Sequence, residues 1–203
     1  KIQTALNQAE GVVQITPAVF ADTQNIAGKT PFGPYLISTS LYLINKDNGS
    51  VAAVSTKSGE VSNVLDNPKI DGKILTATAV TRRSVLVMVT DTGKIYEFDT
   101  IDDQLNEQDT SGDIEKPVAM TSFSTNIYTL DSTDGKVYKR LKTSGGYGKR
   151  TEYIKDGTTV TDSVGLATDS SIYVLKNNGE IVKYLGGEKQ NFSLTDLPFS
   201  ITK

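Results

Sequence analysis

One pattern of apolar and polar residues occurs four times along the chain. Each copy has a run of aliphatic and aromatic residues, a polar turn ending in glycine, and a second apolar run. β-Branched and aromatic residues favour strands, and Asn, Asp and Gly tolerate the positive φ of tight hairpin turns. The pattern therefore predicts four β-hairpins, at residues 41–54, 85–98, 127–140 and 172–184.

The repeat length favours one architecture. The turn glycines Gly49, Gly93, Gly135 and Gly179 lie 44, 42 and 44 residues apart. Each hairpin is preceded by a strand rich in small residues and followed by a fourth, more polar strand. Four strands in each repeat predict the blades of a β-propeller, whereas a β-helix would show shorter and more uniform coils. The small-residue strands are expected at 35–40, 74–81, 118–123 and 163–168, and the fourth strands at 61–65, 105–108, 151–154 and 192–194.

The repeats divide the chain into expected blades. A lead-in of residues 1–32 precedes β-propeller repeats over 33–203, with blades at about 33–68, 73–110, 116–157 and 161–198. Residues 197–203 resemble 116–121, which open an earlier repeat, so they are expected to start a further blade. We therefore expect an all-β fragment of a larger ring of about six blades. A closing strand formed by this last segment is the alternative, and open sheet edges would favour self-association.

The lead-in lacks the repeat pattern. Apolar residues at 2, 5, 6 and 9 share one helical face, and the pattern therefore predicts a helix over 1–10. Strands are predicted at 12–16 and 19–22, on either side of Pro17. The helix would end a stalk or linker, and the lead-in would cover one open edge of the sheets.

Composition excludes several kinds of chemistry. The 203 residues contain no His, no Cys and no Trp. Missing His and Cys remove the commonest general base, thiolate nucleophiles and nearly all structural zinc sites. With 21 basic and 24 acidic side chains the net charge is −3, which gives no field for nucleic acid. No apolar run reaches the roughly 18 residues of a membrane span. We expect no enzyme activity and no cofactor.

Few segments stand out as candidate sites. The turn 131–135 resembles a calcium loop but has Leu141 where an EF-hand needs Glu, and the five carboxylates within 99–109 are expected to be solvated. The Gly-rich loop 142–150 has no P-loop order, so it is expected to be a connector or a mobile contact loop. The candidate partner-binding residues are Arg82, Arg83, Tyr147, Lys149 and Arg150.

Residues 118–140 (VAMTSFSTNIYTLDSTDGKVYKR) and 165–184 (GLATDSSIYVLKNNGEIVKY) resemble propeller repeats of the NHL/YVTN kind. They look most like the propeller domain of functionally uncharacterised bacterial membrane-anchored proteins. The resemblance covers roughly residues 33–198 and transfers no functional residues. It implies an extracytoplasmic or cell-surface module, tethered by a segment outside this chain.

These observations predict a non-catalytic binding or scaffolding propeller with a protein or glycan partner. The binding surface would be the end of the blades where the turns 45–50, 91–94, 131–136 and 176–180 meet the inter-blade connections. One alternative is a metal-dependent hydrolase or lactonase on a six-bladed propeller. The other is a structural surface component.

Overall fold

The computed structural model describes residues 18–110, 116–131 and 133–193. The predicted helix at 1–10, the predicted strand at 12–16 and the segment 197–203 lie outside these residues. The described chain folds into four antiparallel sheets of four strands, each made from consecutive strands. Two short helices occur in this part, α2 (Gln24–Ala27) and the 3₁₀-helix η1 (Thr81–Arg83). The fold is therefore all-β, as the sequence predicted.

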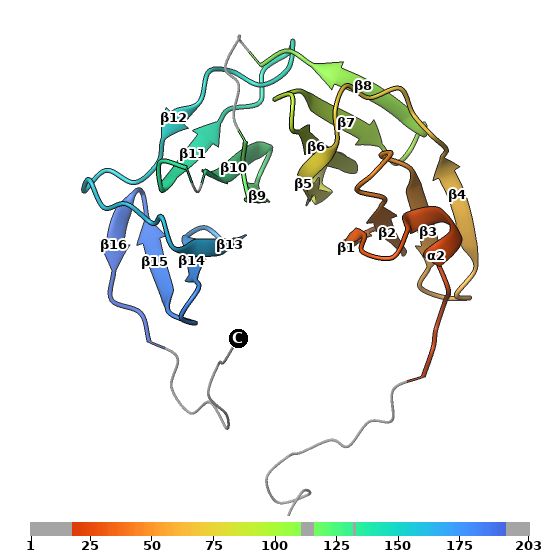
Figure 1. Cartoon of the computed structure of the whole chain (residues 1–203), viewed down its shortest axis with the longest axis horizontal. Coiled ribbons are helices and arrows are strands. Elements are labelled where there is room, and N and C mark those ends of the chain that lie inside the picture. Colours follow the sequence, from red (N-terminus) through yellow and green to blue (C-terminus); the bar gives the residue numbers. More distant parts are fainter. Residues whose placement is uncertain (1–17, 111–115, 132, 194–203) are drawn as a thin grey trace, which may run out of the picture.

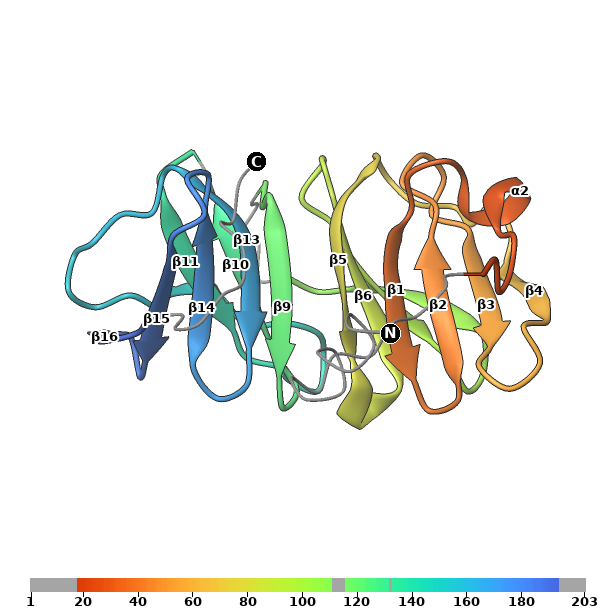
Figure 2. The ribbon, with the colours of Figure 1, turned by 90° about the horizontal axis from the view of Figure 1, so that it is seen from below.

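Each sheet is one blade, with its strands in the order of the chain. The four blades follow one another around an arc, with blades 1 and 4 at its two ends (Figure 1), and Figure 2 shows them from below. The expected larger ring stays a prediction. The strands are β1 (Phe32–Ile37), β2 (Ser40–Ile44), β3 (Val51–Ser55) and β4 (Val61–Leu65) in blade 1; β5 (Ile74–Val80), β6 (Val85–Thr90), β7 (Ile95–Asp99) and β8 (Gln104–Gln108) in blade 2; β9 (Ala119–Phe123), β10 (Asn126–Asp131), β11 (Lys136–Arg140) and β12 (Thr151–Glu152) in blade 3; and β13 (Ser163–Thr168), β14 (Ile172–Lys176), β15 (Ile181–Leu185) and β16 (Glu188–Gln190) in blade 4.

The four predicted hairpins are confirmed, but two predicted strands are wrong. The outer strand of blade 4 is β16, not residues 192–194. Gly186 and Gly187, with φ of 62° and 90°, reverse the chain immediately after β15, so the outer strand starts early. The strand predicted at 19–22 is also absent, and the short helix α2 follows there instead.

Packing between blades follows one rule. Side chains alternate between the two sides of a strand, so each blade has a forward face, directed toward the next blade in the chain, and a backward face. Forward residues of one blade pack against backward residues of the next, and the inner strands β1, β5, β9 and β13 lie side by side in that order. The core is thus three layers between blades: Tyr42 and Ile44 against Leu86 and Met88, Val87 and Val89 against Met120 and Ile127, and Tyr128 and Leu130 against Ile172 and Val174.

A buried carboxylate lies in the second of these layers. Glu97, on the forward face of β7, is 6% exposed and accepts both hydrogen bonds of the Arg83 guanidinium, at 2.7 and 2.5 Å. It also accepts a 2.6 Å bond from the hydroxyl of Tyr147 and a 3.1 Å bond from Lys142. Burial raises the pKa of the Glu97 carboxyl, but the hydrogen bonds from Arg83 and Tyr147 outweigh it and hold the pKa below its usual value. The charged network therefore joins blade 2 to blade 3.

The hairpin glycines have the predicted conformation. The turn residues Gly49, Gly93, Gly135 and Gly179 have φ between 66° and 87°. At Gly135 a Cβ would lie 2.4 Å from Cγ2 of Thr161 and 2.8 Å from its backbone nitrogen. The turn of blade 3 therefore needs glycine for its backbone conformation and for the close approach of the connection to blade 4.

We expect Gly135→Ala to destabilise the protein by about 2 kcal/mol or more, because it adds left-handed strain to a clash with backbone. Chemical unfolding followed by circular dichroism measures the change. Gly145→Ala is the control, since nothing lies within 4 Å of the position of its Cβ. Equal stability of the two variants would contradict the role given to the Gly135 turn.

Glu97→Gln should cost on the order of 3 kcal/mol, because it leaves Arg83 and Lys142 facing a neutral amide in a buried layer. The lowered pKa means that Glu97 contributes its full stability above the ordinary carboxyl pKa, near 4.3. That contribution is lost as pH falls through the folded-state pKa. Urea unfolding between neutral pH and about pH 3 should show a smaller acid-induced loss for the variant than for the wild type.

The matched control is Glu107→Gln in the same blade. Glu107 pairs with Lys94 at 2.6 Å, but its side chain is 48% exposed. Exposed pairs contribute little, so the control should change stability much less than Glu97→Gln at neutral pH. Similar effects of the two substitutions would argue against a stabilising charge network between blades 2 and 3.

Candidate recognition surface

One end of the blades gathers the hairpin turns and the connections between blades. The amide of Ile74 donates to the carbonyl of Lys46, and that of Asp91 to Lys73, at 3.2 and 2.9 Å. In the second half, the amide of Val160 donates to Gly135 at 2.7 Å. The predicted association of turns with connections is therefore confirmed for the connections 66–73 and 156–162, whereas most of the predicted connection 110–116 lies outside the described residues. We call this end, formed by residues 45–50, 66–73, 91–94, 133–136, 156–162 and 176–180, the turn face.

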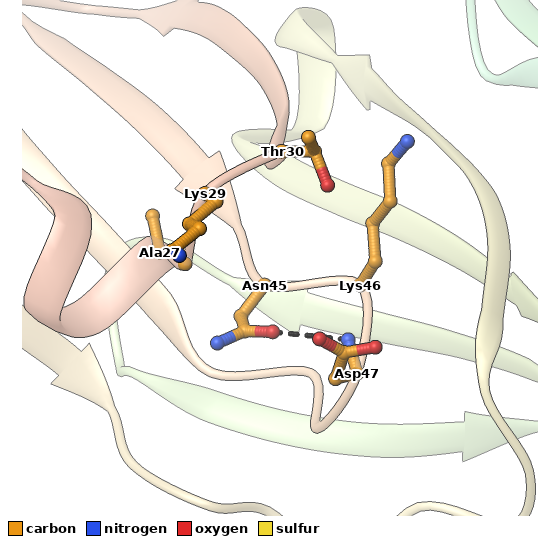
Figure 3. A pocket seen from close by; sticks show the side chains of 7 residues that line it. Ala27, Lys29, Thr30, Asn45, Lys46 and Asp47 are labelled. Carbon is orange, nitrogen blue, oxygen red and sulfur yellow. Dashed lines mark hydrogen bonds between the residues drawn. The ribbon is translucent and has the colours of Figure 1, made fainter.

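A hollow of about 290 Å³ opens on the turn face of blade 1. It lies between the segment that leads from α2 into β1 and the turn that joins β2 to β3 (Figure 3). Its volume is at the lower end of the range for small-molecule sites. It is lined by Ala27, Gly28, Lys29, Thr30, Asn45, Lys46 and Asp47.

Asn45 holds the two walls of this hollow together. Its Nδ2 donates to the carbonyl of Ile26 at 3.2 Å, and its Oδ1 accepts from the amide of Asp47 at 2.9 Å. Gly28 has a φ of 75° and passes so close that a Cβ would lie 3.3 Å from Asn45 Nδ2. The side-chain amide of Asn45 is therefore structural, and it fixes the backbone of both walls.

The other polar side chains that line the hollow come from both of its walls. Lys29 and Thr30 come from the lead-in and Lys46 and Asp47 from the turn (Figure 3). The Lys46 ammonium lies 4.3 Å from the ring centre of Phe32, which limits the positions it can take. Two ammonium groups, one hydroxyl and one carboxylate suit a polar ligand, with the excess of positive charge favouring an anionic group.

Sequence reasoning included the turn of this hollow but missed Lys29 and Thr30. They follow the short helix α2 in a segment that was read as lead-in strands. Gly28 followed by Lys and Thr was the available signal, but it predicts no contact with a turn 16 residues further on. The hollow depends on a long-range hydrogen bond, from Asn45 to Ile26, that local pattern does not encode.

Of the five residues predicted to bind a partner, the structure brings Arg83 and Tyr147 together at one carboxylate. Arg82 and Arg83 form η1 between β5 and β6, at the predicted turn, and Arg82 donates to Oγ of Ser124 at 3.3 Å. Arg83 and Tyr147 converge on Glu97, and Tyr147 is only 1% exposed. Arg83 and Tyr147 therefore contact the protein's own buried carboxylate.

The loop 142–150 connects β11 to β12, as one of its two predicted interpretations had it. Its Tyr147 amide donates to Asp109 at 2.7 Å, and a Cβ on Gly146 would lie 2.4 Å from the same carbonyl. Arg150 lies over the ring of Tyr138 at 4.2 Å and its Nη1 is 3.8 Å from Asp131. Lys149 is exposed. The loop is packed onto blade 2, and partner binding by these residues stays a prediction.

Acidic side chains do not gather into a metal centre in the described part of the chain. No group of three or more Asp, Glu, His or Cys residues is placed there to hold a metal ion. The acidic segment 99–109 begins at Asp99, the last residue of β7, and includes β8. Asp99 accepts a hydrogen bond from the amide of Ile101 at 2.8 Å. No helix among the described residues is long and apolar enough to cross a membrane.

Comparison with known proteins identifies the fold. No protein-family model matches the chain, and no curated protein matches it. A solved structure of a nidogen/laminin complex contains a similar chain, a β-propeller with 13% sequence identity and a TM-score of 0.55. The similarity covers 74% of this chain and 57% of that one, so this chain matches little more than half of its length. The chain described here has a β-propeller fold with four blades.

Proposed function

We propose that this β-propeller is a non-catalytic protein-binding module that acts outside the cytoplasm. The observation that carries the proposal is the hollow on the turn face, built from two segments and lined by two lysines, Lys29 and Lys46. The absence of His and Cys from the sequence removes the side chains most used for general-base and thiolate catalysis. The extracytoplasmic location rests on the resemblance of the repeats to those of membrane-anchored bacterial proteins.

The hollow suits an acidic side chain of a partner protein. A carboxylate entering beside Lys29 and Lys46 would form charge-assisted hydrogen bonds, and the hydroxyl of Thr30 could donate a further one. Asp47, beside Lys46 on the wall formed by the turn, would accept a backbone amide or a basic side chain of the same partner. The remainder of the turn face, with its polar turns, would supply the wider contact that a protein interface needs.

The structural comparison agrees with this class of function. The similar solved chain belongs to a complex of two proteins, nidogen and laminin. At 13% identity the likeness concerns the fold, so the contact residues of that complex are not transferred. It supports a propeller as a scaffold for protein contacts, and the site on this chain is argued from its own residues.

An array of random 12-residue peptides tests the proposal on the purified full chain. Acidic peptides should be enriched among the binders, and added salt should lower their affinity for the chain. A Lys29→Ala, Lys46→Ala double variant should bind the selected peptides about tenfold or more weakly, since a hydrogen bond to a charged group contributes about 1.5–3 kcal/mol. Fluorescence anisotropy with labelled peptides measures this change.

The control removes two other lysines from the turn face. Lys69 and Lys73 are exposed on the connection 66–73, outside the hollow, so Lys69→Ala, Lys73→Ala should leave peptide affinity nearly unchanged. Equal losses in both double variants would show non-specific attraction and overturn the assigned site. Turnover of ester or lactone substrates with added Ca²⁺ or Mn²⁺ would contradict the non-catalytic role.

A further inference from the structure

The forward face of blade 4 lies at the end of the arc (Figure 1). We propose that it is the docking surface for a second copy of this chain, in a dimer that places the two blade-4 faces against each other around a two-fold axis. This surface is separate from the hollow on blade 1, so the proposal goes beyond the proposed function. It is argued from equivalent positions in the other blades.

Equivalent forward residues are buried in the first three blades and exposed in the fourth. In each hairpin, the residue two positions after the turn glycine pairs with one residue of the second strand: Val51 with Ile44, Ile95 with Val89, Val137 with Leu130 and Ile181 with Leu175. Ile44, Val89 and Leu130 have no exposed surface, whereas Leu175 is 37% exposed. Blade 4 thus carries the residue types of an interface between blades at positions that face outward.

The exposed face is hollowed at its centre. A groove of about 230 Å³ runs beside Leu175, where the small residues Gly165 and Ala167 of β13 leave room. It continues over Leu166, Tyr173 and Ile181. Phe192 packs edge-on against Tyr173, with 5.4 Å between ring centres, and forms a rim. Large aliphatic side chains from a facing sheet would fill this groove, as they do between the other blades.

The opposite end of the arc is partly covered by the chain itself. On the backward face of blade 1, Ala52 and Val54 of β3 are 0% and 3% exposed, and α2 packs against β3. Ala27 of α2 is 1% exposed. Leu36 on β1 is left open at 55%. Because α2 occupies part of this face, a second copy has no complete backward face to join head to tail, which favours pairing of the blade-4 faces.

The charges at the margin of the face suit a two-fold arrangement. Lys183 on β15 and Glu188 on β16 lie on the forward side, since Glu188 pairs in register with Leu185. The position of Lys183 corresponds to Glu97 of blade 2, whose carboxylate pairs with cations of the layer between blades 2 and 3. In an isologous dimer each Lys183 would find the partner's Glu188, which gives a polar margin around an apolar centre.

Sedimentation equilibrium of the full chain, from micromolar to near-millimolar concentration, tests the proposal. The mass should rise with concentration toward twice the 21.9 kDa of the monomer. Leu175→Lys should remain a monomer, because it places charge at the centre of the contact. Leu36→Lys is the matched control at the other end of the arc and should dimerise like the wild type. Circular dichroism melting checks that both variants fold.

A charge exchange gives a second, milder test. Lys183→Glu alone should weaken dimerisation at least tenfold, and Lys183→Glu combined with Glu188→Lys should restore it. A wild type that stays monomeric at every concentration would overturn the proposal. Loss of dimerisation in Leu36→Lys would show head-to-tail joining and overturn the two-fold arrangement. A monomer that dimerises only after removal of residues 194–203 would show that the chain's own tail occupies the face, which also overturns it.

Discussion

The constraint on which this fold depends is that a blade has two faces and both must be covered. A sheet packed on each side by another sheet needs apolar residues at nearly every position, not at alternate ones. Blade 2 meets this condition, since all six residues of β6 are buried. In the blades at the two ends of the arc, only one face is packed against another blade, and the other face differs between the two. The short helix α2 covers part of blade 1, whereas blade 4 keeps an exposed apolar groove.

The layer between blades 2 and 3 shows what happens when a polar residue enters such a position. Glu97 stands between two buried aromatic residues, Tyr96 and Phe98, in a strand whose sides face different layers. The fold keeps it ionised by supplying a guanidinium, an ammonium and a phenol around one carboxylate. Two of these groups come from the long loop between β11 and β12. That loop is therefore part of the core between blades, and its glycines allow it to reach Asp109 closely.

Much of this fold could be predicted from the sequence because its signals are local. The hairpins depend on apolar runs and positive-φ glycines, and the inner strands on small residues at a constant spacing. The outer strand of blade 4 could not be predicted from the sequence. Its residues Glu-Lys-Gln have no apolar pattern, and the Gly186–Gly187 turn determines where the strand begins. Arg83 was correctly predicted to lie at the turn between the first two strands of its blade, and Tyr147 in the loop between the last two strands of blade 3. The burial of Tyr147 was missed because its partner Glu97 is 50 residues away in the sequence.

The cover that α2 gives to blade 1 has a consequence for the order in which the protein is made. Synthesis proceeds from the N-terminus, so α2 and blade 1 leave the ribosome before blades 2, 3 and 4. Its lead-in helix emerges ahead of it and is at hand as soon as β3 forms. The first sheet therefore has an early partner on its backward side while its forward side waits for blade 2. Each later blade forms against a surface that already exists, which gives assembly a direction along the arc and limits how long apolar sheet faces stand exposed during translation.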